Sequence, residues 1–156
     1  MPDWLIDQNA GVHAARIFAA LLLAGAIGFE REASDQSAGL RTHMLVGVGS
    51  CLFTLLMMIL IDRYQSDGVR ADPVRIVSAI TSGVAFLAAG AIIQGRDKVK
   101  GLTTGGSLWM SGAVGLSCGL GEYALAMIAV SVTLIVLLVV KALERVLFRE
   151  DRDEPS

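Results

Sequence analysis

The residues best suited to chemistry flank one short charged connection between two apolar segments. They are the polar side chains that end the first segment and open the second: Glu30, Arg31, Glu32, Arg41, Thr42 and His43. A helix that begins here has free backbone N–H groups and the positive end of its dipole, which favour an anion. Two interpretations remain open. Either Arg41 pairs with Glu30 or Glu32 and locks the segments together, or these charges line a vestibule at a membrane surface, where ionisable groups commonly mark a site.

A second set of polar residues lies within or beside the later apolar segments, where it forms either a pathway or a packing surface: Arg75, Ser82, Thr103, Thr104, Ser107 and Trp109. Hydroxyl side chains in apolar helices often bond a carbonyl one turn back, so one interpretation is purely structural. The alternative is a polar path down the middle of a helix bundle. Trp109 lies well inside its segment, away from either interfacial aromatic belt, and is predicted to be a packing anchor within the bundle.

Other kinds of chemistry find little support in the sequence. There is no nucleophile motif, no metal-binding pair of histidines, no phosphate loop and no basic face for nucleic acid. Magnesium prefers carboxylates with retained water, but the acidic residues near the inner surface all lie outside the apolar segments: Glu30, Glu32, Asp97 and Glu144. We therefore expect a protein that is not an enzyme and has no cofactor, and we leave open whether it binds a metal.

The elements that position these residues follow from composition. The 156-residue chain is 54% hydrophobic and only 18% charged, with a mean hydropathy of +0.62, whereas soluble domains carry about 25% charged residues. A helix needs about 20 apolar residues to cross roughly 30 Å of hydrocarbon. Five windows of about this length are present: 14–29, 43–61, 74–93, 102–120 and 123–140. The sequence predicts an all-α, polytopic transmembrane bundle of about five spans.

Basic residues set the expected orientation. Residues 1–13 lack the basic start of a signal peptide and are predicted to be an external lead-in; residues 14–140 form the membrane domain, and 141–156 a charged cytoplasmic tail. With five spans, nine basic residues fall on one side: Arg31, Arg41, Arg96, Lys98, Lys100, Lys141, Arg145, Arg149 and Arg152. Four fall on the other side: Arg16, Arg63, Arg70 and Arg75. This excess predicts a cytoplasmic C-terminus and an external N-terminus.

Two parts of the chain are similar to each other. Residues 22–27 read Leu-Leu-Ala-Gly-Ala-Ile and residues 87–92 read Leu-Ala-Ala-Gly-Ala-Ile. Each is followed by a charged loop and then by Gly-Leu-x-Thr, at 39–42 and 101–104. The pattern is typical of two duplicated hairpins related by an axis along the membrane normal, although short matches also arise by chance between helices rich in these residues. The fifth window is aliphatic on nearly every side, so it is expected to face lipid or a second copy, with a homodimer as the default.

The ordered set of motifs resembles the membrane domain of the MgtC/SapB family. The similarity covers about residues 14–121 and rests on these segments: Gly25-Ala-Ile-Gly-Phe-Glu-Arg-Glu32, Gly39-Leu-Arg-Thr-His-Met-Leu-Val46, Asp72-Pro-Val-Arg75, Ser82-Gly83, Phe86-Leu87, Gly101-Leu-Thr-Thr104 and Ser107-Leu-Trp109. Ala85 and Ala88 stand where the family usually has glycine. The resemblance is expected to be closest to the short SapB-like form, without the cytoplasmic C-terminal domain that many MgtC-type members carry.

The resemblance implies a bacterial inner-membrane protein of about five spans. The family carries a label of magnesium transport, yet its members are better regarded as factors for adaptation to low magnesium or stress, some of them thought to act on the ATP synthase. Our leading hypothesis is a non-enzymatic modulator of magnesium or ion homeostasis, or of membrane energetics. The alternative is a transporter or channel for Mg²⁺ or another small solute, with its path between the two hairpins.

Overall fold

The computed structural model describes residues 9–64, 72–94 and 99–143. Its elements, in chain order, are α1 (Ala10–Ala33), α2 (Leu40–Tyr64), α3 (Pro73–Gly90), β1 (Ile93–Gln94), β2 (Val99–Lys100), α4 (Leu102–Leu120), α5 (Tyr123–Ile135) and a π-helical continuation, η2 (Val136–Val140). The prediction of an all-α bundle is confirmed. The two strands add only a short antiparallel pair, in which Ile93 lies opposite Lys100 and Gln94 opposite Val99.

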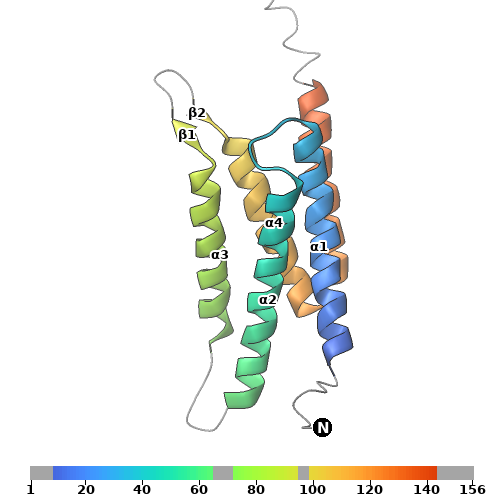
Figure 1. Cartoon of the computed structure of the whole chain (residues 1–156), viewed down its shortest axis with the longest axis vertical. Coiled ribbons are helices and arrows are strands. Elements are labelled where there is room, and N and C mark those ends of the chain that lie inside the picture. Colours follow the sequence, from blue (N-terminus) through green and yellow to red (C-terminus); the bar gives the residue numbers. More distant parts are fainter. Residues whose placement is uncertain (1–8, 65–71, 95–98, 144–156) are drawn as a thin grey trace, which may run out of the picture.

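The five helices run up and down alongside one another (Figure 1). The helix α4 is central: it packs most extensively on α2 and also contacts α1, α3 and α5. The helix α3 lies at one edge, packs mainly on α4 and makes few contacts with α2. The main apolar core lies among α1, α2, α4 and α5, and includes Ile27, Leu55 and Val114.

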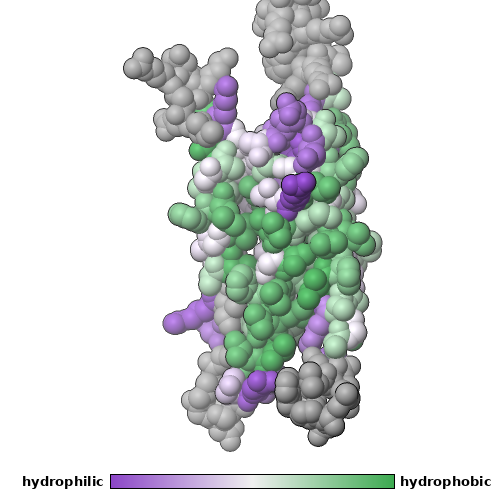
Figure 2. Space-filling view, in the orientation of Figure 1, coloured by the Kyte–Doolittle hydropathy of each residue, from purple (hydrophilic) through white to green (hydrophobic). Residues whose placement is uncertain are grey.

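Among the described residues, four helices are long and apolar enough to cross a membrane: Ala10–Ala33, Leu40–Tyr64, Pro73–Gly90 and Tyr123–Leu143. The view in Figure 2 shows the corresponding apolar band, with hydrophilic residues gathered toward the two ends. The helix α4 has 19 residues but is not among the four, because glycine, serine and threonine lower its hydropathy. Its central place in the bundle accounts for this composition, since its neighbours are mostly other helices and not lipid.

Glycines allow α2 and α4 to meet backbone to backbone. A Cβ atom at Gly115 would overlap the carbonyl oxygen of Gly47, and one at Gly119 would lie 2.6 Å from the Cβ of Thr54. On the other side of α2, a Cβ at Gly47 would lie 2.5 Å from the Cβ of Ala24. These small residues thus form the contact surfaces of α1, α2 and α4.

The ends of α3 show what the sequence predicts well and poorly. At its start, one residue before the predicted window 74–93, Asp72 accepts a hydrogen bond from the Val74 N–H at 3.0 Å and Pro73 occupies the first turn. At its end, the helix stops at Gly90 and not at residue 93, because the N–H groups of the next two residues bond carbonyls three residues back. Gly101 then adopts a φ of +88° and leads into α4.

The two similar segments therefore differ in structure. In the first copy, the helix α1 continues to Ala33, well past residues 22–27, whereas α3 ends within residues 87–92. The helices that follow are alike, because α2 and α4 each begin at the leucine of Gly-Leu-x-Thr. At the N-terminus, residues 10–13 belong to α1 and not to the predicted lead-in. The rest of that lead-in, residues 1–8, and the tail from residue 144 lie outside the described residues.

Candidate functional site

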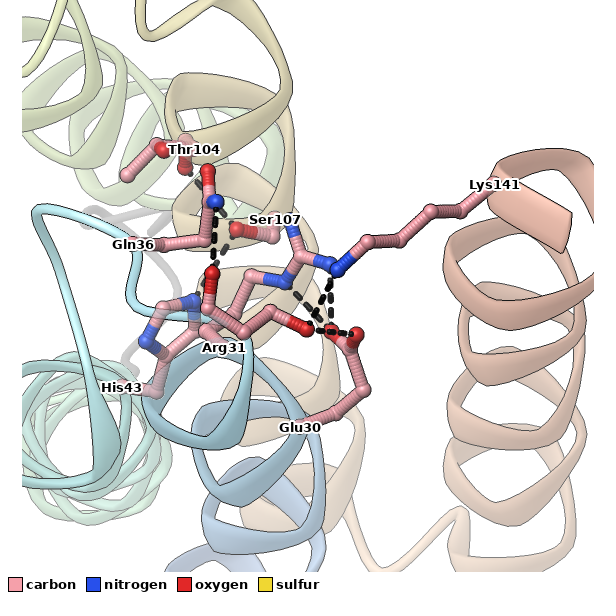
Figure 3. Close-up of polar contacts among 8 residues, drawn as sticks. Glu30, Arg31, Gln36, His43, Thr104, Ser107 and Lys141 are labelled. Atoms are coloured by element: carbon pink, nitrogen blue, oxygen red, sulfur yellow. Dashed lines mark hydrogen bonds and ion pairs between the residues drawn. The ribbon is translucent and has the colours of Figure 1, made fainter. Parts of the chain in front are cut away.

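A buried ion pair lies at the end of α1. The side chain of Arg31 is 4% exposed and that of Glu30 is 8% exposed, and both the Nε and an Nη of Arg31 lie 2.5 Å from one Glu30 oxygen. The other Glu30 oxygen accepts a hydrogen bond from the Ser34 hydroxyl at 2.8 Å. The Lys141 ammonium donates to that hydroxyl, also at 2.8 Å. Figure 3 shows Lys141 reaching across from its own helix toward this pair. We call Glu30, Arg31, Ser34 and Lys141 the ionic network.

The local sequence explains how the ionic network forms. Ser34 follows Glu30 by four residues, so both side chains lie on one face at the end of α1. Lys141 directly follows η2, and its long side chain spans the distance between the two helices. The network contains one carboxylate and two cations, so it carries a net positive charge. It joins the end of α1 to the end of the last helix.

Glu32 has a different role from Glu30. Its carboxylate is exposed and accepts a hydrogen bond at 2.8 Å from the N–H of Leu40, the first residue of α2. This bond satisfies one of the free N–H groups of the helix terminus. Gly39 leaves room for it, because a Cβ there would overlap the carboxylate. Glu32 therefore fixes the connection between α1 and α2.

His43 joins α2 to α4. Its side chain is fully buried. Its Nδ1 lies 2.8 Å from the carbonyl oxygen of Gly39, which only accepts, so Nδ1 carries a proton. Its Nε2 lies 3.0 Å from the Ser107 hydroxyl, which in turn lies 2.9 Å from the Thr104 carbonyl oxygen. The Ser107 hydroxyl can donate to a neutral imidazole, or accept from an imidazolium while donating to the carbonyl, so it has a partner in either state.

Below His43, a track of buried hydroxyl groups follows the same interface. Ser50 and Thr54 on α2 and Ser111 on α4 are each at most 3% exposed. The Thr54 hydroxyl donates to the carbonyl of Ser50 at 2.8 Å, as the structural interpretation predicts. The Ser111 hydroxyl has no hydrogen-bond partner within the described part of the chain. The hydroxyl track is polar but closely packed, since it lies beside the Gly47–Gly115 contact.

Several candidate residues lie apart from this cluster. Arg41 and Thr42 are exposed on α2 and line a groove toward α3. Arg41 does not pair with Glu30 or Glu32, because those carboxylates bind Arg31, Ser34 and the Leu40 N–H.

The remaining candidates lie on the outer faces of α3 and α4. Thr103 and Ser82 are exposed, and Arg75 lies 3.7 Å from its near neighbour Asp72 at the start of α3. Trp109 is 44% exposed and lies against α3, so the expectation of an anchor inside the bundle was wrong. The reason is that α3 covers only part of this face of α4.

Three residues that join helices at the two ends of the bundle were not among the candidates predicted from the sequence. Ser34 and Lys141 complete the ionic network, and the four-residue spacing of Ser34 from Glu30 was a usable signal. Arg16 lies at the opposite end of α1 and donates to the Gly119 carbonyl at 2.7 Å, which joins α1 to the end of α4. Its spacing of four residues from Ala20, and then Ala24, places it on the packed face of α1. Within the described residues, no group of three or more His, Cys, Asp or Glu side chains could hold a metal ion.

Comparisons with known proteins identify a family and several relatives of this chain. The MgtC family model matches residues 17–146. "Putative magnesium transporter YhiD" of Escherichia coli (strain K12) is 39% identical over 123 residues, which is 78% of this chain and 57% of that protein. "Protein MgtC" of Brucella abortus (strain 2308) is 40% identical over 116 residues, 74% of this chain and 46% of that protein. "Protein MgtC" of Salmonella typhimurium (strain 14028s / SGSC 2262) is 39% identical over 118 residues.

The chain spans about half the length of the curated relatives it matches. No solved structure is significantly similar to it. Together, the apolar helices and these relatives identify a membrane protein. The chain belongs to the MgtC family.

Proposed function

We propose that this chain is a non-enzymatic modulator of magnesium or ion homeostasis, or of membrane energetics, and that the ionic network is its functional site. The observation that carries the proposal is the buried Glu30–Arg31 pair and its link through Ser34 to Lys141. Beside it, the hydrogen bond between His43 and Ser107 joins α2 to α4. A change of charge at this end of the bundle would therefore alter contacts that α1, α2, α4 and the last helix share.

Stability alone is a poor reason to bury this pair. Moving two charges out of water costs about as much as their attraction returns, and apolar replacements of buried ion pairs are often neutral or stabilising. The pair is instead buried among helices at the end of α1, and ionisable side chains that face the interior of a membrane bundle commonly mark a functional site. The net positive charge of the network suits it to respond to anionic groups or to changes in cation concentration at its surface.

The alternative is a transporter for Mg²⁺ or another small solute through the interface of the hairpins. It is favoured by the name of the E. coli relative, by the similar segments, and by the hydroxyl track. The packing of that interface argues against it, because the backbones of α2 and α4 meet at Gly47 and Gly115. A solute passing between them would have to separate the closest contact in the bundle.

A modulator needs a partner, and the last helix offers a surface for one. Outside the face that packs on α4 and α1, α5 and η2 expose a continuous aliphatic surface that includes Leu125, Ile128, Val132, Ile135 and Val139. We propose that this surface meets lipid, a second copy of the chain, or another membrane protein such as the ATP synthase. The location is the bacterial inner membrane, with the ionic network on the cytoplasmic side and the N-terminus outside.

Magnesium uptake into proteoliposomes separates the two functions. The purified chain is reconstituted around a fluorescent magnesium indicator, with a magnesium ionophore as the positive control. A modulator gives no more uptake than protein-free liposomes. Uptake that Glu30→Gln abolishes, while Glu32→Gln preserves it, would overturn the proposal in favour of transport. Glu32→Gln is the matched control because its amide oxygen still accepts the Leu40 N–H bond.

A further inference from the structure

A long groove separates α2 from α3. It has a volume of about 950 Å³ and is lined almost entirely by apolar side chains, among them Leu45, Phe53 and Leu87. It follows from the loose contact of α3 with α2. At the end of the groove that lies beside the start of α2, the lining includes two polar residues, Arg41 and Thr42, both in the first turn of that helix.

Two glycines deepen this groove. Gly49 on α2 and Gly83 on α3 both line it, and a Cβ built at either position would meet no atom within 4 Å. These glycines therefore differ from Gly47 and Gly115, whose missing side chains are needed for helix contact. The space beside Gly49 and Gly83 can therefore hold part of an apolar ligand.

From these features we infer that the groove binds an anionic phospholipid, with its phosphate on Arg41 and Thr42 and an acyl chain beside Gly49 and Gly83. The guanidinium of Arg41 is exposed and makes no ion pair with a residue in the described ranges. A guanidinium matches the geometry of a phosphate and binds it through paired hydrogen bonds. The apolar walls below it match hydrocarbon.

On α2 the groove lining runs from Arg41 to Leu60, a helical rise of about 28 Å, so the groove is longer than one leaflet. Half of the roughly 30 Å hydrocarbon layer is about 15 Å, which corresponds to about ten residues of helix. Counting from Arg41, this distance reaches Cys51, two residues past Gly49. An acyl chain whose headgroup sits on Arg41 thus occupies the half of the groove that contains Gly49.

Binding is measured by native mass spectrometry of the whole chain with phosphatidylglycerol or phosphatidylcholine of identical acyl chains. The wild type is expected to retain phosphatidylglycerol about fivefold better, the effect of one basic residue at a membrane surface. Arg41→Gln abolishes this preference. Gly83→Leu and Gly49→Leu fill the groove and reduce retention of both lipids. Arg63→Gln, at the other end of α2, and Gly106→Leu, at an open position on α4, behave as the wild type.

Two results would overturn the inference. Equal retention of both lipids by the wild type and by Arg41→Gln would mean that only unspecific surrounding lipid is bound. A dimer that Gly83→Leu dissociates, with lipid retention unchanged, would assign the groove to a second copy of the chain. Arg41→Gln tests the headgroup contact independently of whether the leucine variants fold.

Discussion

Glu30 is the residue on which the proposed site depends, because it binds Arg31 on one oxygen and Ser34 on the other. The sequence predicted a charged cluster at this end of the first helix, and one of its two interpretations made Arg41 the partner of Glu30 or Glu32. It could not predict the Glu30–Arg31 pair, since adjacent residues on a helix normally do not face each other. Only the packing of α1 against its neighbours turns both side chains toward the same buried space.

Removing one member of this pair should destabilise the protein more than removing both. Glu30→Gln or Arg31→Gln alone leaves a buried charge without its counterion, and each is expected to lower the free energy of unfolding by about 3 kcal/mol or more. The double variant Glu30→Gln/Arg31→Gln should lose clearly less than the sum of the two. The free energies of unfolding of the wild type, the two single variants and the double variant are measured in detergent, with circular dichroism as the signal. Additive effects would mean that the two side chains do not interact.

At the scale of elements, the helices were largely predictable and their ends were only partly so. The bounds of α4 coincide with the predicted window 102–120, because Gly101 and Gly121 stop the helix on both sides with positive φ values. The end of α3 at Gly90 was not predictable, since the residues that follow are as apolar as those within the helix. The π-helical stretch η2 also has no signal in its uniformly aliphatic sequence.

The contact between α2 and α4 should be sensitive to a single methyl group. Gly115→Ala places a Cβ against the Gly47 carbonyl, so the two helices must separate. Such overpacking typically costs about 1–3 kcal/mol, and we expect a lower melting temperature in detergent. Gly106→Ala on the same helix meets no atom within 4 Å. That control should match or exceed the wild type, because alanine favours a helix over glycine by up to about 1 kcal/mol. Equal melting temperatures for both variants would contradict the close contact.

At the scale of the whole molecule, the five helices of the described residues run alternately up and down, so the first begins and the last ends at opposite ends of the bundle. The start of α1 and the end of η2 lie at opposite ends (Figure 1). The expectation of five spans predicted this arrangement, and the uneven distribution of basic residues adds the prediction that the end of η2 is on the cytoplasmic side. The side chains that join the helices at each end, Arg16 at one and the ionic network at the other, could not be assigned partners from sequence alone.

Labelling of single cysteines tests the proposed orientation. Ser37→Cys lies in the connection between α1 and α2, and Arg63→Cys lies near the other end of α2; both positions are exposed. A membrane-impermeant maleimide added to spheroplasts should label Arg63→Cys at once and Ser37→Cys only after lysis. The native Cys51 and Cys118 are fully buried and serve as the unreactive background. The reverse labelling pattern would place the ionic network outside the cell.

The most direct measurement of the central claim is growth at limiting magnesium in a bacterium that lacks its own MgtC protein. The strain carries this chain as wild type, Glu30→Gln or Glu32→Gln, with expression adjusted until the amounts in the membrane are equal. We predict that the wild type and Glu32→Gln restore growth, because Glu32 only holds the Leu40 N–H, and that Glu30→Gln does not. If Glu30→Gln restores growth as fully as the wild type at the same abundance, the ionic network is not the functional site.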